Sequence, residues 1–269
     1  MNRKRENDML QKLIDVVLQA GAVIRSAHDV ERSVREKTSS RDLVTKYDAQ
    51  VQEFLQRELL KLLPQAGFYG EEGAHMAHPE SFEWLFIVDP IDGTTNFIQG
   101  FRNSSVSVGL MHRGTMEYGV VYNPYDGELY SAQRGRGAFL NGEPIRTADR
   151  PLDHSLLIVG TALYYRELID QTVKIFCAAF PRVQDIRRFG SAALDLCYLA
   201  AGKAGVFYEC RLSPWDYAAG SLIAAEAGCT VTQLSGAELD YYRKCSVLAG
   251  SPKAYAELFQ LIAEKEAAQ

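Results

Sequence analysis

Hydrophobic residues near the start of the chain recur at the spacing of amphipathic helices. The first predicted helix presents one apolar face, formed by Leu10, Leu13, Ile14, Val17, Leu18, Gly21 and Ile24. A second helix presents Val51, Phe54, Leu55, Leu59 and Leu62. This helix is predicted to end before Pro64, because proline cannot continue a helix. The chain is therefore predicted to begin with two amphipathic helices.

The pattern changes between Phe68 and about Arg146, where short apolar stretches alternate with Gly, Asn and Pro turns and predict strands. Two of these strands, 104–112 and 116–122, flank an Arg113-Gly114 turn. After Pro151, strands and helices alternate. The predicted strands are 156–159, 183–186 and 205–208, and the helices are 167–179, 192–201, 214–227 and one that begins at Ser251-Pro252. We expect mixed sheets sandwiched by helices, in two halves (1–150 and 151–269) without a flexible hinge, and therefore a single α+β or α/β domain.

Composition narrows the class of protein. The 269 residues are 47% hydrophobic and 23% charged, as in ordinary globular proteins, and the net charge of −5 gives no general attraction for nucleic acid or an anionic membrane. No apolar run is long enough to span a bilayer, and the polar stretch Met1–Asp8 does not resemble a signal peptide. The five cysteines are widely spaced and form no C-x-x-C pair, so we expect a reducing cytoplasm, no disulfide framework and no zinc site.

Acidic residues follow the apolar stretch 84–88, which is predicted to be a buried strand. The sequence Asp89-Pro90-Ile91-Asp92-Gly93 then leads into a Thr-Thr-Asn start to a short helix. Taken alone, Asp-Pro and Asp-Gly are turn formers. A functional interpretation requires partners, because a strand end is a rigid place from which carboxylates can converge.

Further acids are available as partners. Glu71 and Glu72 lie in a GEEG sequence after a short apolar segment, Asp216 follows Ser213-Pro214-Trp215, and Asp42 and Asp48 flank Leu43-Val44-Thr45. Each has an alternative structural interpretation, since Ser213 with Asp216 is typical of a helix cap. Four carboxylates that converged on one pocket would repel one another and take up protons unless divalent cations neutralised them.

Together these segments resemble the inositol monophosphatase family of metal-dependent phosphatases, in the same order and at similar spacing over nearly the whole chain. The segments are DLVTKYD (Asp42–Asp48), GEEG (Gly70–Gly73), DPIDGTTNF (Asp89–Phe97) and PWDYAAG (Pro214–Gly220). The resemblance implies a layered αβαβα sandwich and a homodimer. It also implies hydrolysis of a small-molecule phosphate monoester, most simply inositol monophosphate.

The resemblance implies that two or three Mg²⁺ ions, or Mn²⁺, are held by Glu71, Asp89, the carbonyl of Ile91, Asp92 and Asp216. Oxygen-only ligands suit these metals. The implied mechanism is an in-line displacement by a metal-activated water. The implied catalytic residues are Glu71 with Thr94 and Asp48, which orient and deprotonate that water. Lys37 and Glu72 match positions around a third metal and the water.

For the substrate, the resemblance implies phosphate contacts at Gly93, Thr94 and Thr95, whose backbone N–H groups stand at a helix N-terminus. Further substrate contacts are implied at Gly190, Ser191, Ala192, Glu209 and Asp216. Arg211 departs from the family pattern, in which glycine is typical. Its guanidinium either reaches a second phosphate or carboxylate of the substrate or remains a solvated surface charge.

Other motifs are weak or missing. Gly135-Arg136-Gly137 is best interpreted as a hairpin turn, and neither a P-loop nor a G-x-S-x-G elbow is present. His75 and His78 are expected in solvent. Alternative functions are a sister phosphatase for fructose 1,6-bisphosphate, a 3′-phosphonucleotide, NADP or histidinol phosphate, and, from another class, a catalytically silent regulatory protein on the same fold.

Overall fold

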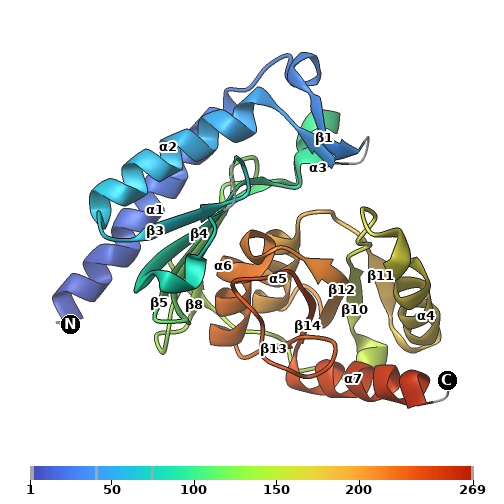
Figure 1. The fold of residues 1–269 in the computed structure, drawn as a ribbon. Helices are drawn as coiled ribbons and strands as arrows, with labels where there is room; N and C mark the ends of the chain where they lie inside the picture. Colours follow the sequence, from blue (N-terminus) through green and yellow to red (C-terminus); the bar gives the residue numbers. More distant parts are fainter. Residues whose placement is uncertain (1–2, 40–41, 74–75, 268–269) are drawn as a thin grey trace.

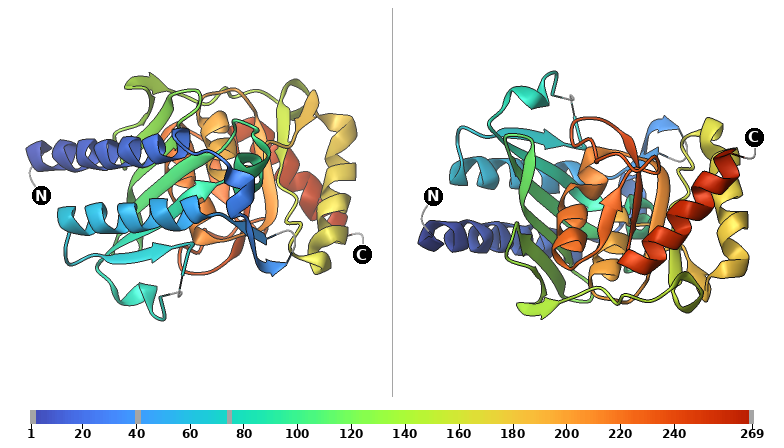
Figure 2. Two further views of the ribbon diagram at one scale, coloured as in Figure 1. Left: turned by 90° about the horizontal axis from the view of Figure 1, so that it is seen from above. Right: turned by 90° about the horizontal axis from the view of Figure 1, so that it is seen from below.

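The computed structural model describes residues 3–39, 42–73 and 76–267, and its elements form five layers (Figures 1 and 2). Helices α1 and α2 cover one face of a seven-stranded sheet, and α5 and α6 lie between that sheet and a five-stranded sheet. Helices α4 and α7 cover the outer face of the second sheet. The two termini lie at opposite ends of the molecule. The layered αβαβα arrangement expected from the sequence is confirmed.

The helices follow the predicted periodicities closely. They are α1 (Arg3–Arg25), α2 (Lys46–Leu62), α3 (Thr94–Gln99), α4 (Ile169–Ala179), α5 (Ala192–Ala200), α6 (Pro214–Glu226) and α7 (Pro252–Ala267). The predicted helices 192–201 and 214–227 each end one residue earlier. The predicted helix 167–179 begins as a 3₁₀ turn, Arg166–Leu168, and becomes α-helical only at Ile169. No helix among the described residues is long and apolar enough to cross a membrane.

The seven-stranded sheet has the order β3-β4-β5-β6-β7-β8-β9, in which only β3 and β4 are parallel. Its strands are β3 (Gly67–Gly70), β4 (Trp84–Asp92), β5 (Ser105–His112), β6 (Thr115–Asn123), β7 (Glu128–Gln133), β8 (Ala138–Leu140) and β9 (Glu143–Ile145). The predicted Arg113-Gly114 turn has both residues at positive φ, the geometry that a two-residue hairpin between twisted strands needs. Gly135 and Gly137 lie in the turn before β8, as predicted.

The five-stranded sheet has the order β11-β10-β12-β14-β13, with β10 parallel to both β11 and β12. Its strands are β10 (Leu156–Val159), β11 (Asp185–Arg187), β12 (Val206–Leu212), β13 (Thr230–Thr232) and β14 (Cys245–Gly250). A two-stranded ribbon, β1 (Arg35–Ser39) with β2 (Asp42–Val44), precedes α2. Strand β12 runs four residues beyond the predicted 205–208 and carries a register shift against β14 between Glu209 and Leu212.

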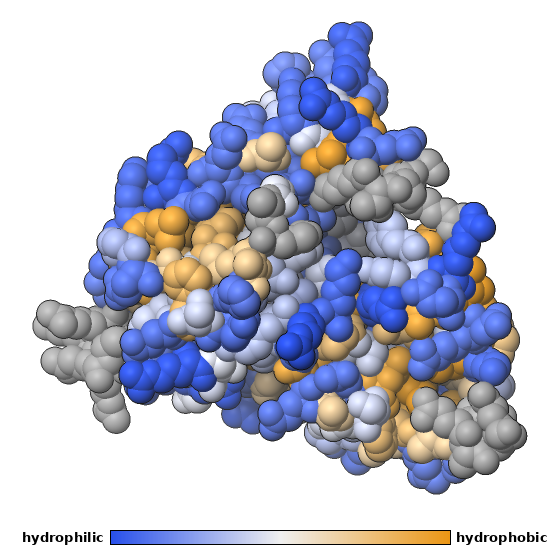
Figure 3. Space-filling model, in the orientation of Figure 1, coloured by the Kyte–Doolittle hydropathy of each residue, from blue (hydrophilic) through white to orange (hydrophobic). Residues whose placement is uncertain are grey.

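Close backbone packing joins the layers. A Cβ atom at Gly119 of β6 would lie 2.7 Å from the carbonyl oxygen of Ala219 in α6, so only glycine permits this approach. The face shown in Figure 3 is mostly hydrophilic, with apolar atoms gathered near α1 and β3 and near α7. Apolar side chains otherwise fill the spaces between layers, where Leu13, Val51, Val108 and Ile223 are fully buried.

Candidate metal and phosphate site

The four predicted acidic metal ligands come from the ends of three elements, β3, β4 and α6, which meet between the two sheets. Glu71 follows β3, and its backbone N–H donates to the carbonyl of Val88, which fixes it beside β4. Asp89 and Asp92 stand in the last part of β4 and are 2% and 7% exposed. Asp216 lies in the first turn of α6. The parallel pairing of β3 with β4 brings the first three acids to one edge of the sheet.

The pKa values show that these carboxyls act on one another. Burial raises the pKa of Asp89 well above its ordinary value, and the charges of Glu71, Asp92 and Asp216 raise it further. Burial likewise raises the pKa of Asp216 well above its ordinary value, with Asp92 and Glu71 adding to the effect. The pKa of Asp92 rises to about 6 through burial, although hydrogen bonds from Ser191 and Ala193 oppose the rise. Four acids therefore share one poorly solvated region.

Local hydrogen bonds fix each acid. Asp92 Oδ2 accepts from Ser191 Oγ at 2.5 Å and from the N–H of Ala193 at 2.8 Å, so this carboxylate caps the start of α5. Asp216 Oδ2 accepts from the N–H of Ser213 at 2.7 Å as part of a capping box. Asp89 Oδ1 accepts from the N–H of Ile91 at 3.0 Å. The capping role expected for Asp216 is therefore real, and it orients the acid.

The residues fit a hard divalent cation by their chemistry. Among the described residues, no three acidic, histidine or cysteine side chains form a complete metal cage as they stand. The donors are nevertheless carboxylate oxygens, the type that Mg²⁺ and Mn²⁺ prefer. Their mutual charge is costly without cations, because each acid raises the pKa of Asp89.

Thr94 and Asp48 form a second part of the site. Thr94 Oγ1 lies 3.2 Å from Asp48 Oδ1 and 3.0 Å from the carbonyl oxygen of Ile91. Asp48 is fully buried, and its Oδ2 accepts from the N–H and hydroxyl of Thr45 at 2.8 and 2.6 Å. The capping box of α2 thus aims one carboxylate oxygen at Thr94. A hydroxyl and a carboxylate in this arrangement can hold and deprotonate a water.

The predicted phosphate and substrate segments also meet. Gly93 has a φ of 86°, and a Cβ atom there would lie 2.9 Å from the carbonyl oxygen of Gly190. Thr94 and Thr95 begin α3, where the first backbone N–H groups of a helix have no intrahelical partner. Ala192 begins α5. The hydroxyl of Ser191 is engaged by Asp92, so it holds a candidate metal ligand in place.

Glu209 lies near this region, and Arg211 is engaged elsewhere. Glu209 Oε1 accepts from the N–H of Ala162 at 2.8 Å, and burial raises the pKa of this carboxyl to about 7. The charge of Asp92 raises that pKa further, so the two carboxyls interact electrostatically. Arg211 donates to Glu167 Oε1 at 2.8 Å and is 35% exposed, which makes it neither fully solvated nor directed at the acids.

The predicted positions Lys37 and Glu72 have different outcomes. The side chain of Lys37, like that of Asp42, lies outside the described residues. For Glu72, the backbone N–H and carbonyl both bond to the side-chain amide of Gln52 in α2, at 2.8 and 2.5 Å. His78 is exposed as expected, and His75 lies outside the described residues.

Sequence reasoning missed Asp195 and Gln52. Asp195 is 2% exposed in α5, and its Oδ1 has no hydrogen-bond partner among the residues that the structure describes. Burial, with the nearby charges of Asp92 and Glu209, raises its pKa well above the ordinary value. A single acid within the apolar stretch Ala192–Ala200 was the available signal. Two cavities of about 190 and 200 Å³ are lined by residues such as Tyr198 and Lys203 or Arg150 and Gly205, and by none of the four predicted metal ligands.

A family model described as the inositol monophosphatase family matches residues 6–267, nearly the entire chain. The chain belongs to the inositol monophosphatase family. It is 37% identical to human inositol monophosphatase 2 over 96% of this chain and 90% of that protein. It is 36% identical to the Nus factor SuhB of Vibrio cholerae over 95% of this chain and 96% of that protein.

Solved structures agree with this family assignment. An inositol monophosphatase (IMPase) from Thermotoga maritima superposes with a TM-score of 0.85 and 33% identity, over 96% of this chain and 97% of that chain. The extragenic suppressor protein suhB from Bartonella henselae gives a TM-score of 0.88 and 32% identity, over 95% and 98% of the two chains. The family therefore includes relatives named for a phosphatase and relatives named for a Nus factor.

Proposed function

We propose that this protein is a Mg²⁺-dependent phosphatase for phosphate monoesters of small molecules, with inositol monophosphate as the simplest substrate. The observation that supports the proposal best is the mutual effect of Glu71, Asp92 and Asp216 on the pKa of buried Asp89. Such a cluster is unfavourable as architecture, and it is suited to holding divalent cations. The family relationship supports the same activity.

In this proposal Glu71, Asp89, the carbonyl of Ile91, Asp92 and Asp216 hold two or three Mg²⁺ ions, which Mn²⁺ can replace. When bound, the metal neutralises phosphate charge and lowers the pKa of a coordinated water. Thr94 and Asp48 orient the attacking water and accept its proton, because their oxygens already lie 3.2 Å apart. Hydrolysis by this water needs no covalent nucleophile from the protein.

The chain's own backbone and side chains position the substrate. The N–H groups of Gly93, Thr94 and Thr95 receive the phosphate at the start of α3. The turn at Gly190 and the start of α5 form the opposite wall, and Ser191 keeps Asp92 in position. Glu209 accepts hydrogen bonds from substrate hydroxyls. Its acceptance of the N–H of Ala162 leaves other lone pairs for that purpose.

Phosphate release across a substrate panel tests the proposal. The panel is inositol 1-phosphate, fructose 1,6-bisphosphate, NADP, 3′-phosphoadenosine 5′-phosphate and histidinol phosphate, each with Mg²⁺. Hydrolysis of at least one member, abolished in Asp216→Asn, is the expected result. An absence of Mg²⁺-dependent hydrolysis across the panel would argue against the enzyme.

A second candidate function comes from the relatives named Nus factor SuhB, which are as similar to this chain as the named phosphatase is. It is a regulatory role of that kind on the same fold. Complementation separates the two functions: in a host that lacks its own SuhB, rescue by Asp216→Asn would support the regulatory role. If the unaltered chain rescues this host and Asp216→Asn does not, the rescue depends on catalysis.

We further propose a homodimer in the cytoplasm, with no nucleic-acid or membrane partner. Phe101 is 68% exposed and Phe189 is 37% exposed. Asn96 and Asn103 both bond to the carbonyl of Phe189, which joins the segments that carry these two rings. Such a pair is typical of an interface. The five free thiols suit a reducing compartment. Light scattering coupled to size exclusion tests the dimer: Phe101→Ser should shift the mass toward one chain, and an unchanged mass would place the interface elsewhere.

A further inference from the structure

Two cations converge on one aromatic ring at the end of β12. The guanidinium carbon of Arg211 lies 4.7 Å from the centroid of the Tyr165 ring, and Nζ of Lys244 lies 5.4 Å from the same centroid. Lys244 Nζ also donates to the hydroxyl of Tyr165 at 2.7 Å. A ring face attracts both cations, which would otherwise repel each other. The structure therefore holds two positive charges together around Tyr165.

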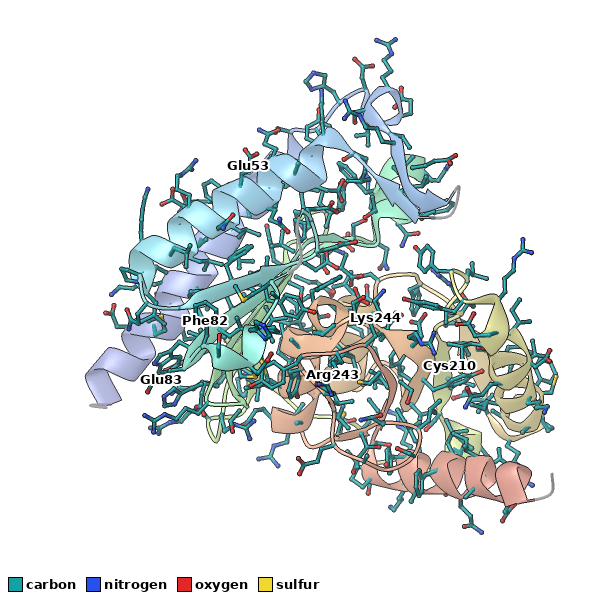
Figure 4. All side chains as sticks on the ribbon, in the orientation of Figure 1. Glu53, Phe82, Glu83, Cys210, Arg243 and Lys244 are labelled. Carbon is teal, nitrogen blue, oxygen red and sulfur yellow. The ribbon has the colours of Figure 1, made fainter. Side chains whose placement is uncertain are left out.

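Strand pairing explains why residues distant in sequence meet here. β12 pairs antiparallel with β14, and the partner of Leu212 is Cys245. Lys244 directly precedes β14 and therefore lies near the end of β12 that carries Arg211. Lys244 and the neighbouring Cys210 are labelled in Figure 4.

Within the described part of the chain, one anion balances the two cations. Glu167 Oε1 lies 2.8 Å from Arg211 Nη1, and the side chain of Glu167 is 61% exposed. Among the described residues, no carboxylate pairs with Lys244. The cluster of Arg211, Lys244, Tyr165 and Glu167 therefore keeps one uncompensated positive charge on a protein whose net charge is −5.

The cluster is joined to the candidate substrate site by the segment 160–165. At one end of this segment the N–H of Ala162 binds Glu209, and a Cβ atom at Gly160 would collide with the Glu209 carboxylate. At the other end is Tyr165, whose N–H donates to the carbonyl of Ala162 at 2.9 Å. On β12, Glu209 and Arg211 alternate with buried residues, so both point to the less buried side. Two residues along a strand span about 7 Å.

We propose that Arg211 and Lys244, held on Tyr165, form a second anion subsite that binds a phosphate or carboxylate at the distal end of the substrate. Glu167 occupies the guanidinium in the absence of substrate, and the substrate anion replaces it. The preferred substrates are therefore phosphate monoesters with a second anionic group about one sugar ring away from the scissile phosphate. This inference rests on the proposed phosphatase function and specifies its substrate class.

The test compares a bisphosphate with a monophosphate in four variants. With fructose 1,6-bisphosphate, Arg211→Met and Lys244→Met should each lower kcat/KM by about ten- to a hundredfold, with most of the change in KM. With inositol 1-phosphate, the same variants should change kcat/KM less than about threefold. Arg166→Met is the matched control, because Arg166 adjoins Tyr165 and is exposed, but is not one of the described cations that lie over the ring.

Glu167→Gln makes the test independent of any loss of folding. Removing the competing carboxylate should lower KM for fructose 1,6-bisphosphate by about three- to tenfold and leave inositol 1-phosphate unaffected. A purely structural ion pair predicts no gain for either substrate. Equal effects of the Arg211 and Lys244 variants on both substrates, or no gain in Glu167→Gln, would overturn the subsite while hydrolysis itself upheld the phosphatase.

If no substrate is hydrolysed, the phosphatase proposal fails and the subsite is tested by binding alone. The probe is then fructose 1,6-bisphosphate, titrated into the protein in a calorimeter with Mg²⁺ present. Weaker binding by Arg211→Met and tighter binding by Glu167→Gln would support the subsite. Equal binding by all variants would overturn it.

Discussion

Replacing Glu209 with glutamine should separate the stability of the fold from substrate binding. Glutamine has nearly the same shape as glutamate, and its carbonyl oxygen can still accept from the N–H of Ala162. The substitution therefore removes mainly the charge. That charge is unfavourable in the folded protein, because burial raises the pKa of Glu209 to about 7, with Asp92 adding to the rise and Arg188 opposing it.

The sign and size of the effect follow from this pKa. The ordinary value is 4.5, so the folded protein binds the proton more tightly than the unfolded chain does. The stability that this proton provides is fully present below pH 4.5 and is lost as the pH rises through 7. A shift of about 2.5 pH units corresponds to about 3 kcal/mol, and because the side chain is partly exposed we expect about 1–3 kcal/mol.

Urea unfolding of the metal-free proteins between pH 4.5 and 8.5 measures this difference. Glu209→Gln should match the unaltered protein near pH 4.5 and become more stable by about 1–3 kcal/mol at pH 8. Glu143→Gln, at an exposed position on β9, controls for the loss of one negative charge. A difference that does not change with pH, or a less stable Glu209→Gln at pH 8, would refute the reasoning.

Activity should change in the opposite direction. At pH 8 the Glu209 carboxylate is ionised and accepts charge-assisted hydrogen bonds from substrate hydroxyls. Glu209→Gln should therefore lower kcat/KM for inositol 1-phosphate by about tenfold or more. A variant that is both more stable and fully active would show that Glu209 contacts no substrate.

The remaining predictions concern the acids and the packing. Asp92→Asn and Asp216→Asn should each lower kcat by at least about a hundredfold with an unchanged circular dichroism spectrum, and near-native kcat in either would remove that residue from the ligand set. Mg²⁺ should raise the Tm of the unaltered protein several times more than it raises the Tm of Asp216→Asn, because a ligand that binds only the folded state stabilises that state. Equal rises in Tm would place the metal elsewhere. Gly119→Ala should cost about 1–3 kcal/mol in urea unfolding, since its Cβ atom would lie 2.7 Å from the carbonyl oxygen of Ala219, and no loss would mean that the layers can separate there.

The fold could be predicted from the sequence wherever one periodicity dominates. The apolar faces of α1 and α2 and the long apolar run of β4 were sufficient to predict these elements. Strand β12 was predicted too short, because its second half alternates the polar Glu209 and Arg211 with buried Cys210 and Leu212, and pairing with β14 decides its length. The start of α4 was misplaced because a 3₁₀ turn shares the polar composition of a first helical turn.

The acids of the site were predicted from their position at element ends, but their supporting contacts were not. Ser191 was predicted as a substrate contact, and the bond that its hydroxyl donates to Asp92 was not predicted. Gln52 lies in α2 at a position that a helical pattern treats as solvent, and it bonds to the backbone of Glu72. Such contacts join residues 20 to 99 positions apart, a separation that no local pattern encodes.

The central claim is that the buried acids hold Mg²⁺ for phosphate hydrolysis. It is tested most directly by phosphate release from inositol 1-phosphate as Mg²⁺ is titrated into chelator-treated protein, with Asp89→Asn measured in parallel. We predict no release without metal, saturable release as Mg²⁺ is restored, and at least about a hundredfold less in Asp89→Asn. Undiminished release after exhaustive chelation, or equal release by Asp89→Asn, would contradict the account.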